Sequence, residues 1–184
     1  MTHDFNQKLE YSLGERENFD INILKEIYKY ADIVKTDTEI DKTGVDYIAT
    51  LRKGGQVFID AKTREPGASK YWKYNEPELT LEIWSVMKTP VNPGKIGWTL
   101  SESSNVDYIL YTFDRSDTNK FYYLPFQMLR TAFRTHFKEW KKQYFVKTQW
   151  SNGWASQAVF VPASAVIADI NRQMTGTAYY QYCV

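Results

Sequence analysis

Apolar residues recur along the first third of the chain with two different spacings, and the spacings predict a helix followed by a β-hairpin. Between residues 19 and 30 the apolar positions recur every three to four residues, as on one face of a helix. Residues 45–51 and 57–62 have the composition of strands, and the paired glycines at 53–56 supply the positive φ that a hairpin turn requires. We therefore expect 45–51 and 57–62 to pair in antiparallel fashion.

The rest of the chain predicts more strands and then helices. Residues 79–86 alternate with period two, and 106–113 is apolar enough for a central strand. After Pro125, which suits the start of a helix, apolar residues recur at helical spacing. This order of elements predicts an α+β or α/β fold, a layered sheet with helices. The other expected segments are a loop at 89–98, a turn at 114–119, strands at 120–124 and 158–161, and a last helix near 165–172.

Composition places the chain among globular proteins. Its 184 residues suit one domain over 1–184, and 43% hydrophobic with 24% charged residues excludes a disordered chain. The abundance of Tyr, Phe and Trp favours a β-containing fold, because these side chains fit a half-buried pleated surface. The same rings also suit stacking on bases, although core packing accounts for most of them.

Charge and cysteine content limit the classes of function. The net charge of +1 gives no global basic field, so any contact with nucleic acid needs a local patch or bound metal ions. The single cysteine, Cys183, excludes an internal disulfide framework and a Cys-rich zinc site, and the distant His3 and His136 weaken a histidine-based centre. Without a signal-like or membrane-spanning apolar run, we expect a soluble cytoplasmic protein with no membrane contact.

Two acidic residues and a lysine fall on the predicted hairpin. Asp46 lies on its first strand, and Asp60 and Lys62 lie on its second. Because side chains alternate along a strand, Asp60 and Lys62 point to the same side while Ala61 points to the other. We therefore expect a carboxylate pair and an ammonium group to face one cavity at the end of a sheet.

These groups suit the hydrolysis of a phosphodiester. The reaction needs an activated water and a charge clamp on the phosphate, and Mg²⁺ provides the clamp through oxygen ligands. Asp46 and Asp60 supply two such ligands, the Ala61 carbonyl could supply another, and Lys62 could orient or help deprotonate the water. Alternatively, Asp-x-Lys is a common tripeptide that often forms a solvated pair, and Asp46 could be a simple strand-edge residue. A carboxylate at the end of the apolar run Phe58-Ile59 nevertheless needs a reason.

The hairpin resembles the PD-(D/E)XK nuclease superfamily, which includes Holliday-junction resolvases, restriction endonucleases and many phage-encoded nucleases. The resemblance rests on residues 41–49, the Gly-Gly turn and 58–64, and extends over roughly 10–115. The acidic motif of the family corresponds to Asp46, preceded here by valine instead of proline, and the (D/E)XK motif to Asp60-Ala61-Lys62. The resemblance implies a restriction endonuclease-like fold with a four-stranded mixed sheet flanked by helices, and one or two bound Mg²⁺ (or Mn²⁺) ions. A third carboxylate on the first helix corresponds to Glu15, with Glu17 and Glu26 as alternatives.

Several other polar residues have both a functional and a structural interpretation. Lys62-Thr63-Arg64 could contact phosphate or form a solvated strand end, and Glu82 could face the same cavity or simply be exposed. A basic and aromatic cluster could bind a nucleic acid strand or pack onto the domain, and cations along the long helix could contact phosphate or form a solvated face. The cluster comprises Lys70, Tyr71, Trp72, Lys73 and Tyr74, and the helix cations are Arg130, Arg134, Lys138, Lys141 and Lys142.

The lead hypothesis is a metal-dependent deoxyribonuclease, endo- or exonucleolytic, in which Asp46 and Asp60 hold Mg²⁺, Lys62 aligns the water and Glu15 supports the metal. DNA is then the expected partner, and a homodimer is left open. One alternative is a nuclease-like fold that binds DNA or protein without catalysis, for example a phage-borne inhibitor of host defence. Another is a structural domain in which the acidic residues and the lysine coincide by chance.

Overall fold

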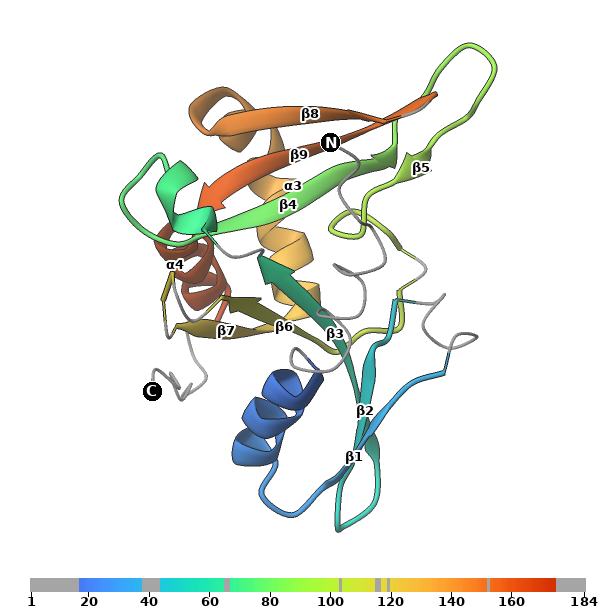
Figure 1. Cartoon of the computed structure of the whole chain (residues 1–184), viewed down its shortest axis with the longest axis vertical. Helices are drawn as coiled ribbons and strands as arrows, with labels where there is room; N and C mark the ends of the chain where they lie inside the picture. Colours follow the sequence, from blue (N-terminus) through green and yellow to red (C-terminus); the bar gives the residue numbers. More distant parts are fainter. Residues whose placement is uncertain are drawn as a thin grey trace, which may run out of the picture.

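The computed structural model describes residues 17–37, 44–64, 67–102, 104–114, 117–118, 120–151 and 153–174. Within these residues the fold is α+β, one of the two classes that the order of elements predicted, and its strands form two sheets (Figure 1). Glu15, His3 and Cys183 lie outside the described residues, so the expectations for them have no structural outcome. No helix in the described part is long and apolar enough to cross a membrane.

The first sheet carries the predicted hairpin. Its strands are ordered β1-β2-β3-β6-β7, and all neighbours are antiparallel except the central pair β3–β6, which is parallel. A helix at residues 17–27 covers one face, where Leu24 packs with Ile59 and Ala61 in an apolar cluster. The strands are β1 (Asp32–Lys35), β2 (Tyr47–Thr50), β3 (Gln56–Arg64), β6 (Tyr108–Phe113) and β7 (Phe121–Pro125).

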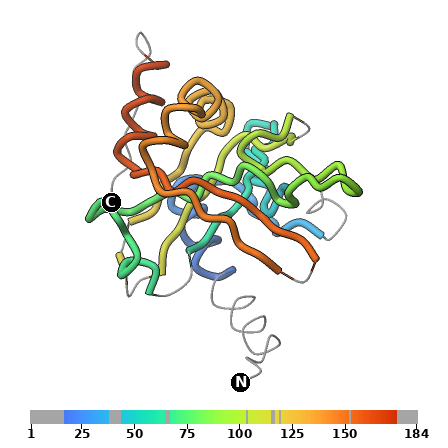
Figure 2. The backbone as a smooth tube through the Cα atoms, turned by 90° about the horizontal axis from the view of Figure 1, so that it is seen from above, coloured from blue at the N-terminus to red at the C-terminus, as the bar shows by residue number. Residues whose placement is uncertain are grey.

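The second sheet is antiparallel throughout, with the order β5-β4-β9-β8. Helices α3 and α4 cover its back face, as both views of the chain show (Figures 1 and 2). Period-two alternation divides β4, because Leu79 and Leu81 are fully buried in the large core while Thr80 points to the opposite, front face. The strands are β4 (Glu78–Val86), β5 (Lys95–Ile96), β8 (Phe145–Ser151) and β9 (Trp154–Pro162), and a short 3-10 helix, η1 (Ala68–Tyr71), precedes β4.

Helices α3 (Phe126–Gln143) and α4 (Ala163–Gln173) are joined by a polar link as well as by apolar packing. His136 Nε2 lies 2.9 Å from Asp169 Oδ1, and the His136 ring stacks on Trp140. Asp169 is 6% exposed and also accepts a 2.7 Å hydrogen bond from Arg172 Nη2. His136 therefore links the two helices.

The structure differs from the predicted elements in three ways. Strands β1 and β8 were not predicted, and short β5 lies within the segment expected to be a loop. The strand expected at 79–86 exists as β4, but it belongs to a second sheet instead of extending the hairpin sheet. The resemblance implied a four-stranded core, whereas the first sheet has five described strands. Both missed strands are mostly exposed, so they lack the apolar alternation by which a half-buried strand is recognised.

Candidate functional site

The end of the β2–β3 pairing brings the two carboxylates of the hairpin close together. The register ends with Tyr47 opposite Ile59, and Asp46 and Asp60 lie just beyond this last pair on their two segments. We had expected Asp46 to lie within the first strand of the hairpin, but it directly precedes β2. Its N–H donates a 2.9 Å hydrogen bond to the Ile59 carbonyl, one residue out of the β2–β3 register, and the Asp46 and Asp60 side chains are in hydrogen-bond contact.

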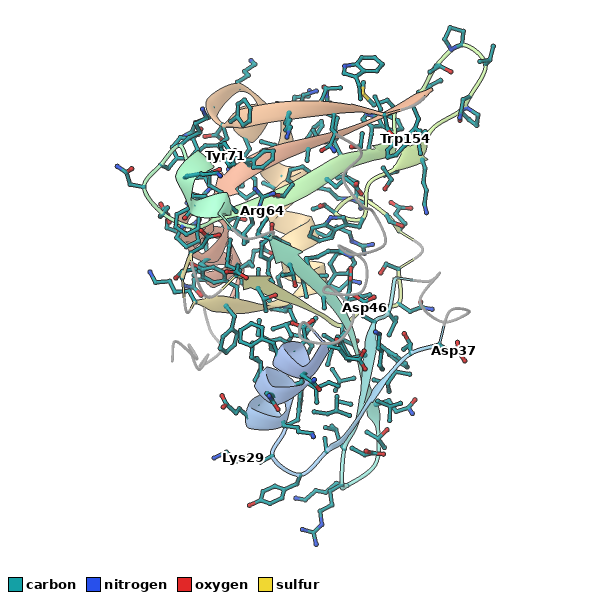
Figure 3. All side chains as sticks on the ribbon, in the orientation of Figure 1. Lys29, Asp37, Asp46, Arg64, Tyr71 and Trp154 are labelled. Atoms are coloured by element: carbon teal, nitrogen blue, oxygen red, sulfur yellow. The ribbon has the colours of Figure 1, made fainter. Side chains whose placement is uncertain are left out.

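The Asp60 carboxylate lies on the sheet face that points away from the 17–27 helix. Ile59 and Ala61 pack in the cluster beneath that helix, so the intervening Asp60 and the following Lys62 point to the opposite side. This is the alternation expected from the sequence. Figure 3 shows Asp46 near the upper end of β2, and Arg64 farther along β3, close to the second sheet.

Each of the three groups is held by a short polar contact. Asp46 Oδ2 accepts a 2.7 Å hydrogen bond from the Ala61 N–H. Lys62 Nζ donates to Asp60 Oδ1 at 2.6 Å. Because the N–H and C=O of one strand residue point toward the same neighbouring strand, the Ala61 carbonyl is directed to the side on which Asp46 lies. Two carboxylates and one carbonyl thus gather at the end of the β2–β3 pairing.

The environment favours the neutral form of Asp60. Asp60 is only 4% exposed, and this burial raises the pKa of its carboxyl to about 7 from an ordinary 3.8. Lys62 lowers this pKa through its charge and its hydrogen bond, while the charge of Asp46 and a hydrogen bond between the two acidic side chains raise it. A buried carboxyl group that touches a second, half-buried one is favoured when the two share a proton or when a cation neutralises them.

The described residues contain no third carboxylate grouped with Asp46 and Asp60. No group of three or more His, Cys, Asp or Glu side chains gathers in that part of the chain. Of the three candidates, Glu15 lies outside it, and Glu17 forms an ion pair with Lys35 at 2.8 Å. Glu26 is exposed nine residues farther along the helix, which is about 13 Å along its axis. One helix therefore cannot bring both Glu17 and Glu26 to the same metal.

Asp20 is a buried carboxylate that the sequence interpretation missed. It is 1% exposed, and its Oδ2 accepts a 3.3 Å hydrogen bond from the Tyr47 hydroxyl. Tyr47 packs in the cluster beneath the helix, so Asp20 lies on the other side of the sheet from Asp60. The available signal was its position three and four residues before buried Ile23 and Leu24, on the apolar face of the helix.

A pocket of about 650 Å³ begins at Lys62 and extends over the front face of the second sheet. Trp98 forms part of its wall, and Lys62 Nζ lies 5.7 Å from the centre of the Trp98 ring. Glu82 also lines it, as one of its two interpretations had expected, and its Oε2 accepts hydrogen bonds from Ser85 Oγ at 2.6 Å and from the Trp98 N–H at 3.2 Å. Lys62 therefore belongs both to the carboxylate pair and to this pocket.

The basic and aromatic cluster divides between pocket and packing. Tyr71 and Lys73 line the pocket. Trp72 instead packs edge-on against Phe113 in the core, and Tyr74 packs against Tyr144. Packing onto the domain thus accounts for Trp72 and Tyr74, while binding of a nucleic acid by Tyr71 and Lys73 stays a prediction.

The cations of the long helix serve partly as anchors. Arg130 Nη1 donates to the Ser101 carbonyl at 2.8 Å, and Arg134 Nη2 donates to Glu102 Oε1 at 2.8 Å. These bonds tie α3 to the segment that follows Trp98. Lys138, Lys141 and Lys142 are exposed, as a solvated helix face would be.

Sequence analysis did not identify the far wall of the pocket, which comes from β8 and β9. Phe145, Lys147 and Gln149 on β8 line it, together with Phe160 on β9. Their arrangement depends on the pairing of strands that are distant along the chain from β3. Comparisons of the chain with family models, with curated proteins and with solved structures find no match.

Proposed function

We propose that the protein is a metal-dependent nuclease that hydrolyses phosphodiester bonds of DNA, with a site of the PD-(D/E)XK type. The observation that carries this proposal is the contact of Asp46 with buried Asp60, beside a lysine that also lines a pocket. A structural ion pair would need one carboxylate for one lysine. The second carboxylate adds repulsion in a buried place, which is a cost that a bound cation removes.

The residues present fit a hard divalent cation. Asp46, Asp60 and the Ala61 carbonyl offer only oxygen donors, which Mg²⁺ and Mn²⁺ prefer, and Mg²⁺ commonly uses one or two carboxylates with several waters. When bound, such a cation would neutralise the carboxylates and offset the negative charge that builds up on the phosphate. Glu15 is the candidate for an additional ligand from outside the described residues.

The side chains of the site supply orientation and charge. The Ala61 N–H fixes the direction of Asp46, and Lys62 fixes that of Asp60, so neither carboxylate has to be ordered when substrate arrives. The Lys62 side chain is 33% exposed, and it keeps N–H groups that can donate to the attacking water or to a phosphate oxygen. In hydrolysis the water oxygen bonds to phosphorus, one P–O ester bond breaks, and the leaving oxygen takes up a proton.

The direct test is cleavage of DNA by the full chain with Mg²⁺, Mn²⁺, Ca²⁺ or EDTA, on linear, single-stranded and forked substrates. We expect cleavage with Mg²⁺ or Mn²⁺ only, and a loss of about 10²-fold or more in Asp60→Ala. Asp32→Ala is the matched control, because Asp32 is an exposed aspartate that pairs with Thr50 at the other end of β2.

Two results would contradict the proposal. One is a parent protein that cuts none of these substrates with any of the metals. The other is an Asp60→Ala protein that is folded by circular dichroism and cuts as fast as the parent. Loss of activity in Asp32→Ala as well would point to a general effect on folding.

A further inference from the structure

The pocket beside Lys62 holds more positive charge than its own acids balance. Arg64 comes from the end of β3, Lys73 from the segment before β4, and Lys147 from β8. In the described part of the chain, no carboxylate lies within ion-pair distance of any of the three. Arg64 Nη1 donates to the Thr80 hydroxyl at 2.8 Å, and its buried Nε has no hydrogen-bond partner there.

The two acids that line the pocket accept their hydrogen bonds from neutral donors, although the charges of Arg64 and Lys73 also act on Glu78. Glu78 accepts a hydrogen bond from the Lys73 N–H, and Glu82 accepts bonds from Ser85 and from the Trp98 N–H. Their charges are therefore partly satisfied by the protein backbone and a hydroxyl. Three cations from separate elements that face one pocket repel each other, and an anionic ligand would relieve that repulsion.

Aromatic rings line the pocket together with the cations. Tyr71 is 66% exposed and Phe145 is 43% exposed, although large rings are normally covered. Lys73 Nζ lies 5.3 Å from the centre of the Phe145 ring, and Arg64 Cζ lies 5.1 Å from the centre of the Phe160 ring. Figure 3 shows Tyr71 and Arg64 at the same end of the second sheet. Cations together with exposed rings match the phosphates and bases of a nucleic acid strand.

We propose that this pocket binds a single-stranded segment of DNA and leads it to Asp46, Asp60 and Lys62. The inference rests on the proposed nuclease function and specifies its substrate as DNA with a single-stranded end, flap or gap. Bases in a duplex are stacked on each other and cannot stack on Phe145 or Tyr71, whereas bases of a single strand can. A pocket of about 650 Å³ has the size of a site for a small ligand, so it accommodates a few nucleotides and not a double helix.

The position of Lys62 gives the bound strand a path to the carboxylate pair. Asp60, Lys62 and Arg64 follow each other on one face of β3, and alternate residues of a strand are about 6–7 Å apart. That spacing is close to the distance between successive phosphates of an extended strand. A phosphate at Arg64 would therefore place a neighbouring phosphate near Lys62 and the carboxylate pair.

The test is fluorescence anisotropy of a labelled 15-nucleotide dT strand and of a 15-base-pair duplex, titrated with the full chain in Ca²⁺. We expect the parent to bind the single strand about tenfold or more tightly than the duplex. Lys147→Gln should weaken binding several-fold and lower the salt dependence by about 0.7 in the log–log slope, as loss of one phosphate contact does. Lys138→Gln is the matched control, because Lys138 is exposed on α3, behind the second sheet (Figure 1).

Phe145 tests the stacking part of the proposal. Phe145→Ala should weaken binding of the single strand about fivefold or more, and Phe145→Tyr should restore it, because either ring can stack. Thermal unfolding of each variant separates lost stacking from lost structure, since Phe145 also contacts Phe160. The Tyr variant keeps the test valid if the Ala variant is unstable.

The outcomes separate this inference from the proposed function. A parent that prefers the duplex would overturn the inference, and so would folded Lys147→Gln and Phe145→Ala proteins that both bind like the parent. If those variants bind normally while the parent cuts DNA with Mg²⁺, the nuclease proposal stands without the pocket. If the parent binds the single strand through these residues but cuts nothing, the pocket stands without the nuclease.

Discussion

Replacing Asp60 with asparagine should stabilise the metal-free protein at alkaline pH. The substitution keeps the size of the side chain and removes the charge that burial and Asp46 disfavour. A pKa that rises from 3.8 to about 7 corresponds to about 4 kcal/mol in favour of the neutral carboxyl, at about 1.4 kcal/mol per pH unit. This value already includes the attraction of Lys62, but asparagine cannot reproduce every hydrogen bond of the neutral carboxyl, so we expect a net gain of about 1–3 kcal/mol at pH 8.

The pH dependence follows from the direction of the shift. Because the folded protein binds the Asp60 proton more tightly than the unfolded chain does, this stabilisation is fully present below a pH of about 4. It is lost as the pH rises through about 7, where the carboxyl becomes charged in the folded state. Asparagine does not titrate, so the advantage of the variant should be small at pH 5 and largest at pH 8.

Urea unfolding in EDTA at both pH values measures this difference. Adding millimolar Mg²⁺ should then stabilise the parent at pH 8 and leave Asp60→Asn nearly unchanged, because ligands that bind only the folded state stabilise it. Asp32→Asn serves as the control, since Asp32 is exposed and should show neither effect. A variant that is less stable than the parent at pH 8 would refute the reasoning, because it would show that the Asp60 charge is stabilised on balance by Lys62.

Three further changes test other parts of the structure. Lys62→Met should slow single-turnover cleavage by about 10²-fold while binding in Ca²⁺ changes little, and unchanged cleavage would remove the lysine from the mechanism. Although burial alone would lower it, hydrogen bonds with Asp169 and Glu139 raise the pKa of His136, so its contribution is present below pH 6.5 and lost above the raised pKa. His136→Gln should therefore cost about 1 kcal/mol more at pH 5.5 than at pH 8.5 in urea unfolding, and equal costs would contradict an ionised link. Gly97→Ala should lower stability by about 1–3 kcal/mol in thermal unfolding, because its Cβ would overlap the Glu82 carbonyl; an unchanged midpoint would show that this segment adapts without cost.

The hairpin and the meeting of its charged residues followed from local sequence. Period-two alternation and the Gly54-Gly55 turn fix which side of the sheet each residue faces, so Asp46, Asp60 and Lys62 could be placed together without the rest of the fold. Helix α3 could also be predicted from local sequence, because apolar residues recur at helical spacing along its 18 residues. The catalytic roles of the three charged residues stay a prediction.

The second sheet and its pocket could not be deduced in the same way. Strand β4 was recognised, but nothing local indicates that it pairs with β9, about 80 residues later, instead of with the hairpin. Edge strand β8 is held in the sheet by its hydrogen bonds with β9. Its mostly exposed residues show no clear apolar alternation. Lys147 and Phe145 therefore had no recognisable signal, and Arg64 had only its position after Lys62.

The two halves of the proposed site differ in how far apart their parts lie along the chain. Asp46 and Asp60 are joined by a short hairpin, whose closure costs little chain entropy and which can form early in folding. The pocket can form only after β9 has paired with β4, and this pairing forms more slowly because the two strands are far apart along the chain. The carboxylate pair should thus form before the pocket does, so in the proposed nuclease the site for the cation would be assembled on the chain earlier than the surface proposed to receive the strand.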